Sequence, residues 1–316
     1  MTHVLQSRAA AGAQPAGGQK PRLQRLRRFF QTAVELTMNA VFFLCGMVAV
    51  ASVALITLYM IASGLPAIRT IGVVDFLLGQ VWASTAADPK YGILPFILSS
   101  LAGTGGAILL GVPVGLATAL FLSKMAPRRL AGPIGAAVEL LAGIPSVVYG
   151  LLGMRILVPA VSRVFGLASG ACLLAAILVL AIMILPSIVS VSITALNAVP
   201  PEYEEGSLAL GATPTETYFK VSIPAAKSGI LTGVVLGIGR AVGEAMAVIM
   251  VAGNVANMPT SLFKSVTFLT TAIAKEMGYA GGLQRQALFS IALVLFVFIM
   301  IINAILNFGL KGGKEQ

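Results

Sequence analysis

Two opposite charges interrupt one apolar stretch of the chain, and their types and spacing allow chemistry with an ion. Arg240 and Glu244 lie four residues apart in segment 228–252, which otherwise consists mainly of Gly, Ala, Val, Ile, Leu and Met. An arginine at the centre of a membrane helix costs roughly 2.5 to 3.5 kcal/mol to insert, so it should face protein or water. A guanidinium in that position can compensate the charge of a passing anion. The pair therefore predicts part of an anion pathway.

Three glycines precede these charges at helical spacing, namely Gly229, Gly233 and Gly237. On an uninterrupted helix they share one face with Arg240 and Glu244. Small residues let a second helix approach closely, so we expect the charges to point into a helix bundle. The alternative is an internal ion pair that only neutralises itself. Arginine before glutamate is the less favourable order on a helix, and apolar residues would stabilise the midplane better, so we favour the pathway.

The elements that position these residues are predicted to be membrane-spanning helices. Of 316 residues, 58% are hydrophobic and only 10% are charged, which is unlike a domain that folds in water. Apolar blocks near the roughly 20 residues that cross a bilayer recur along the chain. We predict an all-α integral membrane protein with six spans, at about 34–62, 93–122, 134–160, 171–196, 228–252 and 287–309.

The distribution of basic residues predicts that both termini face the cytoplasm. Segments on that side would hold 13 Lys and Arg residues and the opposite side 7. The net charge of +10 comes with no basic stripe on a polar element, so a nucleic-acid partner is not expected. Cys45 and Cys172 lie in apolar blocks and His3 is the only histidine, which argues against a metal cluster or a disulfide framework.

Five parts of the chain are expected. The apolar block from Met38 to Ala62 is too long for a signal peptide and should remain as an anchor. The parts are a flexible basic cytoplasmic tail at 1–32, the first transmembrane helix at 33–63, an external loop at 64–92, a core of five transmembrane helices at 93–309 that includes a cytoplasmic loop at 200–224, and a cytoplasmic C-terminus at 310–316.

The loop at 200–224 carries its own start and stop signals and is predicted to be a helix, a turn and a second helix. Gly211 suits the left-handed position that ends a helix. Thr213 and Glu216 then have the spacing of a capping box, which begins the next helix. Tyr218 and Phe219 give that short helix an apolar edge. Because a short helix is not stable alone in water, we expect it to dock into a groove on a partner.

The same loop resembles the cytoplasmic signature of permease subunits of ATP-binding-cassette (ABC) importers. That signature reads Glu-Ala-Ala, three residues, Gly, nine residues, then Ile-x-Leu-Pro. The chain has Glu205, Gly206 and Ser207 at the first positions, Gly211 at the glycine, and 221–224, which ends in Pro224, at the last. The spacing matches throughout, while Gly206 and Ser207 replace the two alanines. The resemblance implies that the loop docks on an ATPase subunit and transmits its closure to the membrane helices.

Three further segments resemble the PstC-type permease subunits of bacterial phosphate importers. They are 237–248 with the following Ala-Gly-Asn, 139–150, and 91–96. The resemblance covers about 70–310 and implies the type I ABC importer permease architecture. It also matches Arg240 and Glu244 to the charged pair that is linked to phosphate passage in the family.

The resemblance implies a set of partners as well. These are a second permease of the PstA type, an ATPase dimer of the PstB type, an external phosphate-binding protein of the PstS type, and membrane lipid. This chain is expected to bind no cofactor, while the partner ATPase would bind ATP and magnesium. The chain contains no Gly-x4-Gly-Lys-Ser/Thr phosphate loop, so it is not expected to hydrolyse ATP or to be an enzyme.

Alternatives remain at the level of the residues. Their physics supports an anion but does not separate phosphate from sulfate or molybdate. A carrier or channel that works alone would have no need of the loop at 200–224, and a membrane enzyme would need a nucleophile or metal-ligand cluster. Glu139 is either an interfacial residue at the start of the third span or the partner of a basic group.

Overall fold

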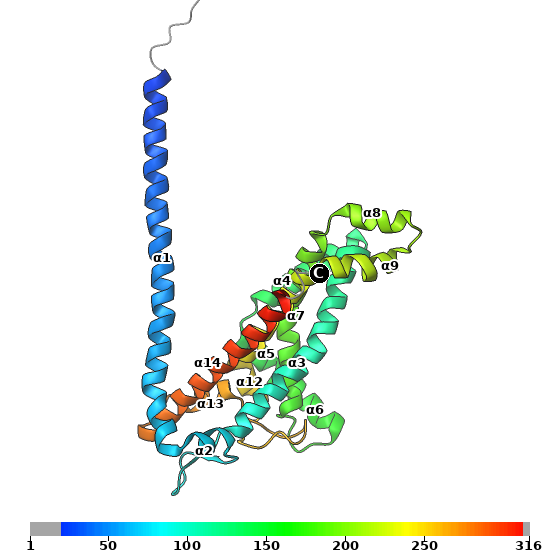
Figure 1. Cartoon of the computed structure of the whole chain (residues 1–316). Coiled ribbons are helices and arrows are strands. Elements are labelled where there is room, and N and C mark those ends of the chain that lie inside the picture. The colour runs from blue at the N-terminus through cyan, green and yellow to red at the C-terminus, as the bar shows by residue number, and fades with distance from the viewer. Residues whose placement is uncertain (1–19, 312–316) are drawn as a thin grey trace, which may run out of the picture. The chain divides into compact units, whose positions relative to one another are not determined.

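The computed structural model describes residues 20–311, with side chains described for 34–127 and 129–305, and its elements are almost all helices (Figure 1). Between Leu58 and Tyr59 the chain divides into two compact units. Within the first unit, helix α1 (Lys20–Ile71) begins inside the segment predicted to be a flexible tail, so 20–32 is helical. Residues 1–19 of that tail lie outside the described residues. From Val34 onward α1 is long and apolar enough to cross a bilayer.

The second unit begins with an ordered segment where an external loop was expected. Helix α1 continues to Ile71 and is followed by α2 (Val73–Leu78) and by a two-stranded antiparallel hairpin, β1 (Trp82–Ala83) and β2 (Lys90–Tyr91). This segment packs on α13 (Leu269–Glu276) and on the start of α14 (Gly282–Lys311). The buried side chains that join them include Phe76, Leu269 and Leu288.

Three helices form the centre of the second unit. Helix α7 (Leu173–Asn197) packs between α3 (Leu94–Leu120) and α11 (Lys227–Gly243). Ile188 of α7 is fully buried there. A Cβ atom at Gly115 of α3 would lie 2.9 Å from the Ile188 side chain, and one at Gly237 of α11 would lie 3.1 Å from it. Glycines therefore let both neighbours approach α7 closely, as in other membrane helix bundles.

Five helical segments of the described residues are long and apolar enough to cross a membrane. A sixth arises if the segment Pro214–Ala225 and helix Lys227–Gly243, which meet at a bend of 71°, count as one span. The chain is therefore a multi-pass membrane protein, as predicted. The five segments are Val34–Ile71, Leu94–Met125, Ser146–Phe165, Leu173–Asn197 and Gly282–Ile305.

The predicted third span at 134–160 is wrong in its position. Helix α4 (Arg128–Gly143) ends before Ile144 and Pro145, and a new helical run then begins with α5 (Ser146–Leu152). The run continues through a π-helical turn, η2 (Gly153–Leu157), into α6 (Val158–Phe165). Ile144 has an extended backbone because the proline that follows disfavours the helical region at the preceding residue. Glu139 lies exposed on α4, ahead of the membrane-spanning run.

The predicted fifth span at 228–252 is interrupted in a similar way. Helix α11 ends at Gly243, Glu244 adopts an extended backbone, and a separate short helix, α12 (Met246–Val251), follows. The charged residues of the sequence prediction therefore lie at a break between two helices rather than within one continuous helix.

Candidate functional site

Arg240 lies in the last turn of α11 and its side chain is half-buried. Glu244 was expected one turn further along the same face, but its extended backbone takes it off that helix. No carboxylate in the described part of the chain lies within the 4.0 Å of an ion pair with Arg240; the two ion pairs there join Lys124 to Glu204 and Lys220 to Glu216. An internal pair between Arg240 and Glu244 is therefore absent.

Glu244 makes local hydrogen bonds instead. Its carboxylate Oε1 accepts a hydrogen bond of 3.0 Å from the backbone N–H of Ala247, in the first turn of α12. Its backbone carbonyl accepts one of 2.8 Å from the hydroxyl of Thr270 in α13. Glu244 thus stabilises the start of α12 by satisfying an N–H group that has no partner within the helix.

Tyr149, which the sequence analysis did not single out as a site residue, lies near Arg240. Tyr149 is buried in α5, and its hydroxyl donates a 2.6 Å hydrogen bond to the carbonyl of Leu141 in α4. That bond bridges the break between α4 and α5. The signal available in the sequence was Pro145, which predicts such a break, within a segment that the family resemblance had already marked.

The two helix breaks adjoin because α5 packs on α12. A Cβ atom at Gly150 of α5 would lie 2.8 Å from the Cα of Ala247 in α12, so the two backbones are in close contact. Arg240, Tyr149 and Glu244 lie at or next to these breaks. Interrupted helices are typical of substrate sites in transporters because their free backbone groups and charges face a pathway instead of lipid.

The glycine face of α11 packs on α7. Cβ atoms at Gly229, Gly233 and Gly237 would meet side chains of α7, at 3.1 Å from Val191 in the case of Gly233. These glycines therefore permit close helix approach, and they set the position from which Arg240 extends.

The loop at 200–224 has the helix, turn and helix that its sequence predicts. Helix α8 (Pro201–Ala209) is followed by Gly211, whose φ of 91° is left-handed. Helix α9 (Pro214–Thr217) begins with a complete capping box: Thr213 Oγ1 accepts a hydrogen bond from the N–H of Glu216, and the Glu216 carboxylate accepts one from the N–H of Thr213. The chain continues through a π-helical turn, η3 (Tyr218–Ser222), into α10 (Ile223–Ala225).

The surface of this loop is exposed and partly apolar. Leu210 is 91% exposed and Phe219 is 59% exposed. Tyr218 was expected to lie on the same docking edge, but it packs within its own chain, and its hydroxyl donates to the Lys124 carbonyl at 3.3 Å. The remaining predicted loop residues divide between exposed Glu205, Gly206 and Pro224 and half-buried Ser207, whose hydroxyl lies 3.0 Å from that of Thr217.

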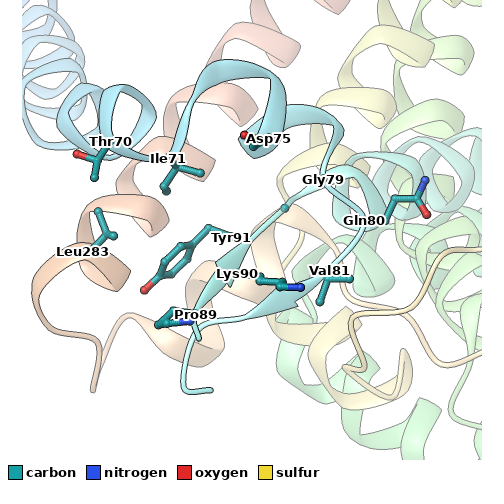
Figure 2. Close-up of a pocket in the computed structure, with 11 residues that line it drawn as sticks. Thr70, Ile71, Asp75, Gly79, Gln80, Val81, Pro89, Lys90, Tyr91 and Leu283 are labelled. Carbon is teal, nitrogen blue, oxygen red and sulfur yellow. The ribbon is translucent and has the colours of Figure 1, made fainter. Parts of the chain in front are cut away.

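A cavity of about 530 Å³ lies at the opposite end of the second unit from α8 and α9 (Figures 1 and 2). Residues at the end of α1, in α2, around β2 and at the start of α14 form its walls, and Asp75 and Lys90 are its charged residues. None of the predicted site residues lines it. This cavity is therefore separate from the helix breaks at Arg240.

Comparisons with known proteins agree on one family. Residues 111–311 match the family model of the binding-protein-dependent transport system inner membrane component. A probable ABC transporter permease protein of Bacillus subtilis, YqgH, is 42% identical over 82% of this chain and 86% of its own length. The phosphate transport system permease protein PstC of Haemophilus influenzae is 35% identical over 87% of this chain and 93% of its own length.

Solved structures agree on the fold. The MetNI methionine ABC transporter in an inward-facing conformation matches with a TM-score of 0.57 and 21% identity, over 70% of this chain and 95% of that one. A bacterial alginate ABC transporter matches with a TM-score of 0.54 and 17% identity, over 90% of this chain and 94% of that one. At these identities the match establishes the shared architecture of ABC importer permeases.

Proposed function

This chain belongs to the family of binding-protein-dependent transport system inner membrane components, and we propose that it forms part of the pathway for inorganic phosphate in an ATP-driven importer. Members of this family are transport components of the inner membrane and not enzymes. We propose that both termini of the chain face the cytoplasm.

The observation that carries the proposal is the unpaired charge of Arg240 beside two helix breaks. A half-buried guanidinium without a carboxylate partner in the described part of the chain lacks compensation until an anion or a partner protein supplies it. An oxyanion that crosses the membrane would supply that charge transiently. Arg240 would therefore stabilise phosphate within a region of low dielectric, where an attractive charge has its largest effect.

Glu244 would limit how tightly phosphate binds. Its negative charge lies next to the same breaks and repels an anion, while its hydrogen bond to the N–H of Ala247 keeps it in place. Weak binding matters because a transported ion must leave the site as readily as it enters. The described residues include no ion pair between Glu244 and Arg240, so this role does not depend on one.

The identity of the anion is supported by the relatives. Permeases named for phosphate transport from Haemophilus influenzae and Methanocaldococcus jannaschii are 35% and 33% identical to this chain over most of its length. These names favour phosphate over sulfate or molybdate. The guanidinium of Arg240 fits all three anions, so the substrate is the part of the proposal that rests on the relatives.

The partners proposed are a second permease of the PstA type, an ATPase dimer of the PstB type, and an external phosphate-binding protein of the PstS type. The ATPase would bind ATP and magnesium, and this chain would bind neither. Exposed apolar side chains on the loop at 200–224, such as Leu210 and Phe219, provide the surface for the ATPase. ATP-driven closure of the dimer would then move the membrane helices between outward-open and inward-open states.

Uptake into vesicles tests this proposal. The chain is reconstituted with the three partners, and uptake of radioactive phosphate is measured with ATP inside the vesicles. We expect uptake to depend on ATP. Excess unlabelled phosphate should suppress it, whereas sulfate and molybdate should leave it unchanged. Suppression by sulfate or molybdate alone would reassign the substrate, and uptake by the chain without its partners would indicate a stand-alone carrier.

A further inference from the structure

A shielded ion pair joins the loop at 200–224 to the end of a membrane span. Lys124 Nζ lies 2.6 Å from Glu204 Oε1, and the two side chains are only 14% and 20% exposed. Lys124 belongs to a π-helical turn, η1 (Phe121–Met125), that ends the span begun by α3, whereas Glu204 belongs to α8. The pair therefore connects two elements that are far apart in the sequence.

Hydrogen bonds extend this pair into the second half of the loop. The hydroxyl of Ser222 donates to Glu204 Oε1 at 2.8 Å, and the hydroxyl of Tyr218 donates to the carbonyl of Lys124 at 3.3 Å. Burial acts to raise the pKa of Glu204, but hydrogen bonds from Lys124 and Ser222 and the positive charge of Lys124 outweigh it, so that its pKa lies below the usual value. Glu204 is therefore ionised and paired at neutral pH.

Few other contacts hold α8 in position. None of its side chains is buried, and Ser207 and Glu204 are the members of α8 whose side chains bond to other elements. Ser207 bonds within the loop itself, to Thr217 of α9. The bond between Glu204 and Lys124 is thus the polar side-chain link from α8 to the span begun by α3.

The chain continues from the loop into α7 at one end and, through η3, α10 and the 71° bend, into α11 at the other. Tyr218 of η3 also joins the loop to the end of the span begun by α3, through the carbonyl of Lys124. The ion pair adds a second route into α3, which packs along α7 and also contacts α11. Motion of α8 would then reach both helices that flank α7.

We propose that Lys124 and Glu204 form a mechanical link that carries the movement of α8 into α3 when the ATPase closes. The inference rests on the proposed function, because it names the residues through which the loop would act. Lys124 and Glu204 are positioning residues that touch no substrate. Through this link α3 and α11 move together. Hydrolysis of ATP is then coupled to opening of the pathway.

Paired substitutions in the reconstituted importer test the link, with ATP hydrolysis and phosphate uptake measured in the same vesicles. In Lys124→Met we expect the ATP hydrolysed per phosphate transported to rise roughly tenfold, because one partner of a shielded pair is lost. Lys220→Met is the matched control, since Lys220 forms an ion pair of 3.5 Å in which its side chain is 76% exposed. That variant should keep the wild-type ratio.

A charge reversal separates the link from general destabilisation. The double variant Lys124→Glu with Glu204→Lys should restore most of the wild-type ratio, whereas either single reversal should not. If Lys124→Met does not assemble, Glu204→Gln is measured in its place, because the amide can still accept from Ser222. An unchanged ratio in an assembled variant, or uptake and hydrolysis that fall in equal proportion, would overturn the link.

Failure of the proposed function has a different signature. The wild-type vesicles would then show no ATP-dependent phosphate uptake at all. In that case amide hydrogen exchange of the purified full chain still tests the contact, since α8 should exchange faster in Lys124→Met than in Lys220→Met. Equal exchange in both variants would refute the link between α8 and α3.

Discussion

Two partly buried basic side chains of this permease have opposite surroundings. Lys124, at the end of the span begun by α3, pairs with Glu204 at 2.6 Å. Arg240, at the end of α11, pairs with no carboxylate in the described part of the chain. A paired charge holds two elements together, whereas an unpaired charge can still form a favourable interaction with an ion or a partner that binds. The contrast supports the two proposals, in which the loop transmits movement and the helix breaks meet an ion.

Removing the unpaired charge should have the largest effect. Arg240→Ala is expected to lower phosphate uptake by about 100-fold or more, because compensation at low dielectric is worth several kcal/mol. Assembly should persist, since no ion pair with a described residue is lost. Uptake in vesicles and size-exclusion chromatography measure the two properties. Arg163→Ala, which removes an exposed arginine of α6, is the control, and uptake near wild type in Arg240→Ala would contradict the pathway role.

A substitution in the loop should disturb transmission rather than binding. Gly211→Val places a β-branched residue at a φ of 91°, a conformation that costs such residues roughly 1 to 2 kcal/mol. The turn between α8 and α9 should shift, and the ATP hydrolysed per phosphate transported should rise roughly fivefold or more. Gly166→Val is the matched control, because Gly166 has a φ of 63° at the end of α6, outside the loop. An unchanged ratio in Gly211→Val would count against docking of the loop.

Two substitutions of Glu244 separate its charge from its hydrogen bond. Glu244→Gln keeps an acceptor for the N–H of Ala247 but removes the negative charge, so phosphate should bind roughly threefold to tenfold more tightly and leave more slowly. Glu244→Ala loses the hydrogen bond as well, at a cost of about 1 kcal/mol at the start of α12. The concentration dependence of uptake measures both. Weaker phosphate binding in Glu244→Gln would show that the carboxylate assists binding.

The smallest effect is expected at the capping box. Thr213→Ala removes the hydroxyl that accepts from the N–H of Glu216, which should destabilise α9 by about 1 kcal/mol. Amide exchange in α9 should therefore be faster by roughly fivefold. Thr215→Ala, at an exposed position of the same helix, is the control. Equal exchange in the two variants would show that packing, and not the cap, holds α9.

Local features of the loop were predictable because they depend on neighbours in the sequence. The left-handed Gly211 and the capping box of Thr213 and Glu216 both occur where their spacing predicts them. The packing of Tyr218 within its own chain was not predictable, because an apolar edge on a short helix does not say which surface covers it. In the structure the end of α3 covers it, through the carbonyl of Lys124.

The helix breaks were harder to predict because an apolar block has the same composition whether it is continuous or interrupted. Pro145 indicated the first break, but the span was still placed across it. No proline marks the second break at Glu244, where bonds to the N–H of Ala247 and from Thr270 fix the extended backbone. Partners from α12 and α13 decide that conformation, and neither is visible in the local pattern.

The sequence by itself determined that the chain folds in a lipid bilayer, that it is a multi-pass helical protein, which family it resembles, and that residues 200–224 form two helices joined by a turn. Long apolar blocks and the spacing of residues within short motifs express these properties directly. Only the tertiary structure decided which charges have partners. Lys124 meets Glu204 across a long separation in the chain, while Arg240 and Glu244, four residues apart, do not pair. The physical reason is that an ion pair depends on a separation of a few ångströms in space, which the fold sets and the spacing in sequence does not.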